Sequence, residues 1–206
     1  VFTTINQALL KSEVIAHYEG NVVKLDKGDR KLNEVKWVLQ DKVGYIFPEP
    51  TTINLSNQTE TGRWSDITDQ KNISDELVSK EVFALWFDHG ARPKDGSYQY
   101  IVVPDVTQAE LSATSSDNRD IDILSNTADL QAVRHNEDQV IQLAFYKAGE
   151  IAISEGIKFR IDSEGIIMLK MKDDQLDQLT ISDPSRKLSR MLVTITGLHN
   201  KSGDNY

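Results

Sequence analysis

The sequence contains no cysteine, little glycine or proline, and no long apolar run. Its 206 residues include 11 glycines and 5 prolines. The lack of cysteine excludes disulfide bonds, thiolate zinc sites and cysteine nucleophiles. The glycines are isolated, so the sequence offers no glycine-rich phosphate-binding loop. The longest apolar run, 82–87, has six residues, whereas a membrane-spanning helix needs about 18. A nucleotide site and a membrane span are therefore both disfavoured.

Acidic side chains outnumber basic ones by 32 to 23, which gives a net charge of −9. Such a chain repels nucleic acid and anionic membranes at long range, so we expect neither as a partner. Hydrophobic residues make up 39% of the sequence, enough for ordinary cores in one large domain or two modest ones. The chain starts at Val1 with no Met and no charged leader, and we expect it to be a piece of a longer polypeptide.

Short segments of alternating polar and apolar residues dominate the first half and predict β-strands. The predicted strands cover residues 35–39, 43–47, 52–55, 82–88 and 97–103. Between the first two, Asp41-Lys42 suggests a tight hairpin. The strand at 82–88 is apolar on both faces, a pattern that belongs in the middle of a layered structure.

A change of character after Pro104 suggests a boundary between two domains. Thr107 and Glu110 have the spacing of a capping box for one short helix, and the residues after them are small and polar. We therefore predict one domain over residues 1–112 and another over 113–206. Strand starts about ten residues apart are typical of a β-sandwich. In the second half, strands are predicted at 121–125, 131–135, 140–146, 151–154, 157–161, 165–172, 179–182 and 192–196.

Metal ligands are sparse. The four histidines are His17, His89, His135 and His199. None has the spacing of a metal ligand set, so we expect no transition-metal site. The acids Asp117, Asp120 and Asp122 supply hard oxygen ligands, but they lack the spacing of an EF-hand. The sequence thus predicts no cofactor, with calcium at these three acids as the alternative left open.

Trp64 is the aromatic residue that points most clearly to a ligand. It follows Arg63 in a predicted turn, and aromatic faces stack on sugar rings while polar neighbours bind the hydroxyl groups. Together with Tyr98 and Tyr100 it could form a sugar-stacking surface. The alternative is that the aromatic residues fill a sandwich core, and this interpretation is favoured for Trp86.

The strand at 82–88 ends in a turn that contains His89 and Arg92. His89 is interpreted as a turn residue that donates to the backbone. Arg92 is predicted, together with Arg63 and Trp64, to contact carbohydrate. No catalytic residue is predicted.

Five motifs, in order along the chain, are similar to those of one enzyme family. They are WVLQDKVGYIFP (37–48), TGRWSDI (61–67), LWFDHG leading to SYQYIVVP (85–104), ILSNTADLQAVRH (123–135) and ISDPS (181–185). Through them the chain resembles the family-eight polysaccharide lyases, which include hyaluronate, chondroitin AC and xanthan lyases. The motifs cover nearly the whole chain, so the resemblance is specific.

The resemblance implies an all-β fold, in which part of a large antiparallel β-sandwich is followed by a smaller C-terminal β-sandwich. It also implies an N-terminal α/α-toroid domain in the same polypeptide as partner, and an acidic polysaccharide as substrate. Family members cleave by β-elimination, with catalytic residues in the toroid and in motifs that this sequence lacks.

From the resemblance we expect this chain to brace the toroid and to touch sugar at its loops, in an extracellular or periplasmic location. Two other classes of function stay open. One is a free-standing carbohydrate-binding module, and the other is a glycoside hydrolase that uses a pair of carboxylates.

Overall fold

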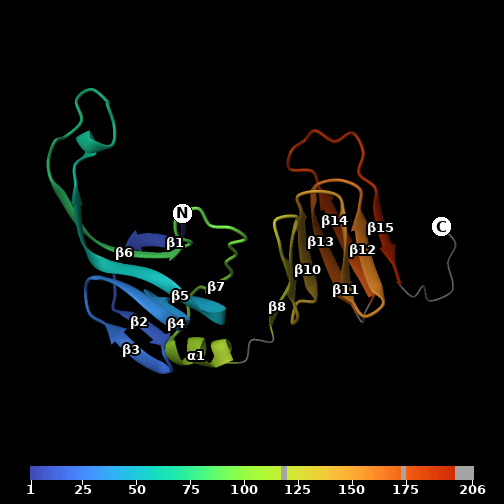
Figure 1. Ribbon diagram of the computed structural model, residues 1–206, viewed down its shortest axis with the longest axis horizontal. Helices are drawn as coiled ribbons and strands as arrows, with labels where there is room; N and C mark the ends of the chain where they lie inside the picture. The colour runs from blue at the N-terminus through green and yellow to red at the C-terminus, as the bar shows by residue number, and fades with distance from the viewer. Residues whose placement is uncertain (117–119, 173–174, 198–206) are drawn as a thin grey trace. The chain divides into compact units, whose positions relative to one another are not determined.

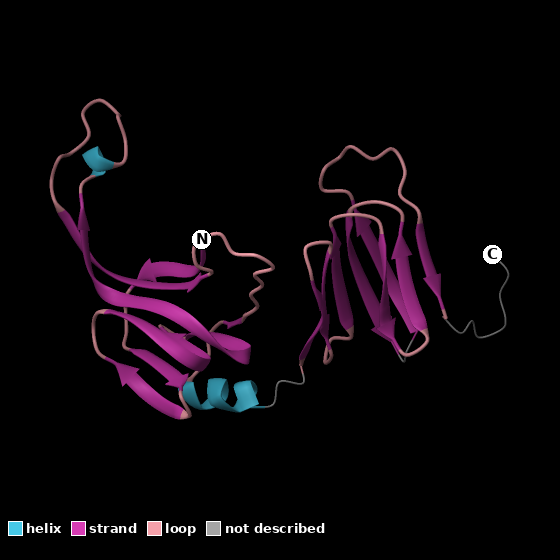
Figure 2. Cartoon of the chain, in the orientation of Figure 1, coloured by secondary structure: helices cyan, strands magenta, loops and turns pink. Residues whose placement is uncertain are grey.

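The computed structural model describes residues 1–116, 120–172 and 175–197. Strands dominate, as Figure 2 shows, and the predicted all-β class is confirmed. The chain divides into two compact units, Val1–Asn118 and Arg119–Tyr206. Helix α1 (Gln108–Ser116) continues past the division that the sequence suggested at residue 112.

Unit 1 is built on one antiparallel sheet with the strand order β1-β6-β5-β4-β2-β3, and β7 also pairs with β5 (Figure 1). The strands are β1 (Phe2–Leu9), β2 (Val14–Tyr18), β3 (Asn21–Leu25), β4 (Asp29–Gln40), β5 (Val43–Gly62), β6 (Val78–Asp88) and β7 (Ile101–Val103). The predicted hairpin at Asp41-Lys42 is confirmed: Gln40 pairs with Val43, and the two turn residues have φ of 47° and 63°, which matches the right-handed twist of the strands.

Three sequence predictions for unit 1 need correction. The segments 43–47 and 52–55 belong to the single long strand β5, which runs through two prolines. The strand predicted at 97–103 is limited to Ile101–Val103. Strands β1, β2 and β3 were not predicted. In β1, polar residues such as Thr3, Asn6 and Gln7 interrupt the alternation.

The core of unit 1 lies on one face of this sheet. On β6 the side chains of Phe83, Leu85 and Phe87 are buried in it. The opposite face of β6 is only half-buried, and Trp86 lies there. The strand that looked apolar on both faces therefore has one fully buried face. Trp86 was expected in the core, but it is only partly buried.

Helix α1 covers a second, smaller core on the other face of the sheet. Its Leu111 is completely buried against Trp37 and Ile46. The predicted capping box is confirmed, because Glu110 N–H donates to Thr107 Oγ1 at 3.3 Å and Thr107 N–H donates to a Glu110 carboxylate oxygen at 2.9 Å. Hydrogen bonds from the Thr107 hydroxyl and N–H lower the pKa of Glu110. No helix among the described residues is long and apolar enough to cross a membrane.

Unit 2 is a sandwich of two antiparallel sheets. Its strands are β8 (Ile121–Asn126), β9 (Leu130–His135), β10 (Val140–Phe145), β11 (Gly149–Ser154), β12 (Ile157–Ile161), β13 (Gly165–Lys172), β14 (Gln175–Ser182) and β15 (Val193–Thr196). The sheet orders are β14-β13-β10-β9-β8 and β11-β12-β15. The core is made of inward side chains such as Leu143, Phe159 and Ile167. All eight strands predicted for this half are found.

The ISDPS motif forms a turn centred on the carboxylate of Asp183. One of its oxygens accepts hydrogen bonds from Ser185 Oγ at 2.6 Å and Ser185 N–H at 2.8 Å. The other accepts from the N–H groups of Lys187 at 2.9 Å and Leu188 at 2.8 Å. These bonds, that of the Ser185 hydroxyl first, lower the pKa of Asp183 to about 2.

We expect Gly44→Ala to destabilise unit 1. A Cβ at Gly44 would overlap Cδ1 of Leu111 and lie 3.1 Å from Cγ1 of Val106. Overpacking of this kind costs about 1–3 kcal/mol, measurable as a fall in the free energy of unfolding in urea. Gly62→Ala is the matched control, because a Cβ there meets no atom within 4 Å. Equal effects of the two substitutions would contradict the packing of α1 on β5.

We expect Asp183→Asn to change the acid dependence of stability. Because the folded-state pKa lies below the ordinary value of 3.8, the carboxylate stabilises the fold above that value and loses this effect as pH falls toward about 2. The wild-type protein should therefore melt at a higher temperature than the variant at neutral pH, and the difference should shrink at acid pH. Asp177→Asn, an exposed change on β14, is the control. A difference independent of pH would refute this role.

Candidate functional site

The predicted sugar contacts Arg63 and Trp64 lie at the tip of an arm. Strands β5 and β6 stay paired as far as Gly62 and Val78, and the loop between them extends away from the rest of unit 1 (Figure 1). We call residues 59–81 the arm. The Trp64 side chain is 55% exposed, at the start of a short 3-10 turn, Trp64–Asp66. The tip thus presents an accessible aromatic ring.

Polar contacts within the loop hold the tip together. Arg63 N–H donates to a carboxylate oxygen of Asp66 at 3.3 Å. Ser65 Oγ donates to Asp75 Oδ1 at 2.6 Å, and Arg63 Nε lies 3.9 Å from the same oxygen. The guanidinium that the sequence offered as a sugar contact is therefore already paired with Asp75.

A second aromatic group lies where β6 ends. It comprises Phe47, Phe87, His89, Tyr98 and Tyr100, and we call it the aromatic cluster. The ring of Phe87 contacts the other four, with centroid distances of 5.7 to 6.4 Å. Tyr98 also lies 5.8 Å from His89 and 6.5 Å from Tyr100. Buried rings thus support half-exposed ones.

The structure separates the aromatic residues that the sequence grouped together. Tyr98 and Tyr100 contact each other, but no ring contact among the described residues joins either to Trp64. The turn prediction for His89 also missed its role in the aromatic cluster. The sequence did contain a signal for this cluster. Phe87 and His89 are two residues apart, as are Tyr98 and Tyr100, and this spacing places each pair on one side of an extended chain.

The N-terminal strand fixes the position of His89. Thr3 Oγ1 lies 2.9 Å from His89 Nε2. His89 N–H donates to the Val1 carbonyl at 2.9 Å. The ring of His89 is therefore anchored to the Thr3 side chain of β1, whereas the sequence suggested a turn residue that donates to backbone.

Arg92, the third predicted sugar contact, lies in the loop that joins His89 to Tyr98 of the aromatic cluster. It is exposed and has a φ of 64°. Among residues 1–116, 120–172 and 175–197, neither Arg92 nor its neighbour Lys94 has an ion-pair partner. Two accessible cations therefore lie close to the aromatic cluster in the sequence.

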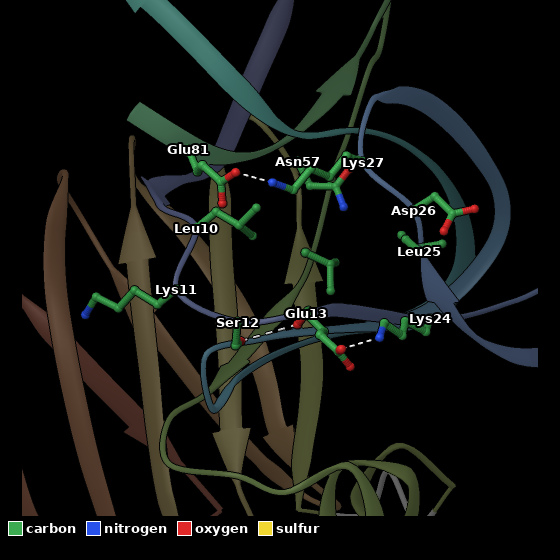
Figure 3. A pocket seen from close by; sticks show the side chains of 11 residues that line it. Leu10, Lys11, Ser12, Glu13, Lys24, Leu25, Asp26, Lys27, Asn57 and Glu81 are labelled. Carbon is green, nitrogen blue, oxygen red and sulfur yellow. Dashed lines mark hydrogen bonds and ion pairs between the residues drawn. The ribbon is translucent and has the colours of Figure 1, made fainter. Parts of the chain in front are cut away.

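A hollow of about 450 Å³ lies elsewhere in unit 1, between β2, β3 and the neighbouring strands (Figure 3). Its lining contains three lysines and three acids but no aromatic ring. Lys24 is paired with Glu13, and Lys27 with Glu81. Charge is thus balanced within the hollow, and it offers a sugar no stacking surface.

The described residues contain no group of three or more histidines and acids that could hold a metal ion. Of the acids considered for calcium, Asp117 lies outside the described residues, and Asp122 accepts a hydrogen bond from the amide of Asn136 at 3.1 Å. His199 also lies outside the described residues.

Burial raises the pKa of Tyr45, whose hydroxyl accepts a hydrogen bond from Asn6.

Two family models match the chain. The first, described as polysaccharide lyase family 8, super-sandwich domain, covers residues 1–115. The second, described as polysaccharide lyase family 8, C-terminal beta-sandwich domain, covers residues 122–191.

Curated relatives extend the likeness to nearly the full chain. The sequence is 32% identical to Chondroitinase-AC of Pedobacter heparinus over 203 residues, which is 96% of this chain and 27% of that protein. It is 32% identical to a hyaluronate lyase of Thermasporomyces composti over 73% of this chain and 18% of that protein. The chain therefore spans about a quarter or less of these relatives.

Solved structures agree with the observed fold. A chondroitinase AC lyase, studied in complexes with oligosaccharides, aligns with a TM-score of 0.76 and 28% identity over 96% of this chain and 30% of that one. A Paenibacillus xanthan lyase aligns with a TM-score of 0.82 over 93% of this chain and 19% of that one, and its 20% identity supports the fold alone.

We expect Asp75→Ala to loosen the tip of the arm. The substitution removes the acceptor of the Ser65 hydroxyl and the partner of Arg63, whereas the core contains no arm-tip residue. Limited digestion with trypsin should cut the variant near Lys71 several times faster than the wild type, with the melting temperature unchanged. Asp69→Ala, another exposed change in the same loop, is the control. Equal cutting rates would show that Asp75 does not order the loop.

Proposed function

This chain belongs to polysaccharide lyase family 8, and from this membership we propose that it forms the C-terminal β-region of a lyase that cleaves acidic polysaccharides such as hyaluronan or chondroitin. The observation that supports the proposal is the run of two family matches along the chain, over residues 1–115 and 122–191. Relatives named as chondroitinase and hyaluronate lyase support the proposed substrate class. An extracellular or periplasmic location is part of the same proposal.

The proposed share of this chain in the reaction is structural and not catalytic. β-Elimination next to a uronate needs cationic or strongly donating groups around the carboxylate, and a base near the proton to be removed. The chain has a net charge of −9. Among the described residues, three groups have a shifted pKa, and each has a structural role: Tyr45 in the core, Glu110 at a helix cap and Asp183 in a turn. The reacting groups are therefore expected in an α/α-toroid outside these residues.

Bracing of that toroid is supported by the surface of β1. This edge strand contains no charged residue or proline, two of the usual protections of a free edge, although its pairing shifts register between Thr4 and Asn6. Its Phe2 is 67% exposed and Leu9 is 54% exposed. Uncovered apolar groups on an edge strand without charges fit contact with a further part of the protein.

Contact with sugar is the second part of the proposed role. We assign it to the loops of unit 1, with Trp64 and Arg63 on the arm and with Arg92 after β6. The exposed Trp64 ring also fits the alternative of a free-standing carbohydrate-binding module, which would bind sugar without any toroid. The two functions differ in whether a longer protein that contains these residues cleaves the polysaccharide.

We expect the 206-residue chain alone to release no unsaturated uronate from hyaluronan or chondroitin, because it lacks the proposed catalytic domain. The measurement is ultraviolet absorbance of the unsaturated product, with Chondroitinase-AC of Pedobacter heparinus as the positive control on chondroitin. Turnover by this chain alone would overturn the assignment of catalysis to another domain. A full-length protein that contains the chain and cleaves neither polymer would favour the binding module.

A further inference from the structure

We propose that the aromatic cluster and the loop between its His89 and Tyr98 form a binding site for an acidic sugar unit, in which the Tyr98 ring stacks on the sugar and Arg92 and Lys94 pair with its carboxylate or sulfate. The inference rests on the proposed function, which supplies the acidic polysaccharide. It moves the main sugar contact from the arm to the end of β6.

The aromatic cluster is rigid, as a stacking surface has to be. Phe47 and Phe87 are buried in the core and meet edge to face, with 85° between their planes. Phe87 is stacked on His89 at 29°, and Tyr100 lies nearly parallel to Tyr98 at 20°. A ring held by such neighbours loses little freedom when a ligand binds.

Tyr98 is the ring that this support leaves accessible. Its side chain is 48% exposed, although the ring contacts Phe87, His89 and Tyr100. One part of the side chain is therefore packed and the other faces solvent. This combination is typical of aromatic residues that offer an apolar face and a polar tip to a ligand.

The loop that carries the cations passes close to the His89 ring. A Cβ at Gly96 would lie 3.7 Å from His89 Nδ1 and 3.7 Å from Cβ of Pro93. Arg92 and Lys94 flank Pro93 in this loop, between His89 and Tyr98 of the aromatic cluster. The left-handed backbone of Arg92, with a φ of 64°, is part of that loop.

Charge selects an acidic sugar over a neutral one. Arg92 and Lys94 have no ion-pair partner in the part of the chain that the structure describes. The nearby acid Asp88 accepts a hydrogen bond from Gly90 N–H at 2.8 Å, and Asp95 is exposed in the loop. In a chain of net charge −9, two unpaired cations beside an aromatic face favour a uronate or a sulfated sugar.

The arm lacks both features. Trp64 has no ring contact among the described residues, and Arg63 is paired with Asp75. A ligand there would have to compete with an existing ion pair. Arg92 and Lys94 have no such pair among the described residues.

The test is calorimetric titration of the 206-residue chain with hyaluronan and chondroitin hexasaccharides, and with cellohexaose as the neutral control. We expect Tyr98→Ala to weaken binding of the acidic sugars about fivefold to tenfold. Tyr98→Phe should retain most of the affinity for the acidic sugars, because it keeps the aromatic ring. Tyr146→Ala is the matched control, because Tyr146 is 57% exposed but lies in unit 2. This variant should bind the acidic sugars with the affinity of the wild type.

The cations are tested by Arg92→Gln and Lys94→Gln. Each should weaken binding about twofold to fivefold, and the double substitution should reduce the dependence of affinity on salt. Cellohexaose should bind more weakly than the acidic sugars to the wild type, and the cation variants should not change its affinity. Circular dichroism and thermal melting establish that each variant is folded.

The outcomes separate this site from the wider proposal. Loss of binding in Trp64→Ala with none in Tyr98→Ala would overturn this site and leave sugar contact at the arm. No heat with any acidic sugar at millimolar concentration would overturn both sugar contacts and leave the bracing role. Equal binding of neutral and acidic sugars would refute the part assigned to Arg92 and Lys94.

Discussion

Strand β5 pairs with β4, β6 and β7, and the features of unit 1 depend on that pairing. Near its start, Gly44 allows Leu111 of α1 to pack closely against the sheet. Phe47, three residues later, supports the aromatic cluster through Phe87. The last residues of β5 leave the core and form the arm with β6. One strand thus connects the small core under α1, the main core and both candidate sugar contacts.

The two candidate contacts differ in how the fold supports them. The arm is a two-stranded ribbon, and isolated ribbons of this kind are marginally stable. It depends on local polar contacts such as Ser65 to Asp75. The aromatic cluster lies on buried residues of a seven-stranded sheet, and β1 adds a hydrogen bond from a distant part of the sequence. A weak ligand such as a sugar is bound better by the group that is already ordered.

The fold of unit 2 could be predicted strand by strand, whereas that of unit 1 could not. In unit 2 each strand is short, alternates regularly and is bounded by turn residues, so local signals suffice. In unit 1, Thr3, Asn6 and Gln7 weaken the alternation of β1, because edge strands need not bury every second residue. Tyr98 also resembled part of a strand, but ring contacts and not strand pairing fix its position.

The sequence by itself determined the all-β class, the family, the capped helix and the exclusion of cysteine chemistry, because each depends on composition or on residues close together in the chain. Only the tertiary structure decided which aromatic residues meet. The sequence favoured Trp64 over Tyr98 as the sugar contact, yet Trp64 lies on an arm and Tyr98 lies in a packed cluster. The reason is that a local pattern specifies a strand but not its neighbours. The contact that anchors His89 joins residues 86 positions apart, and only the pairing of β1 with β6 brings them together.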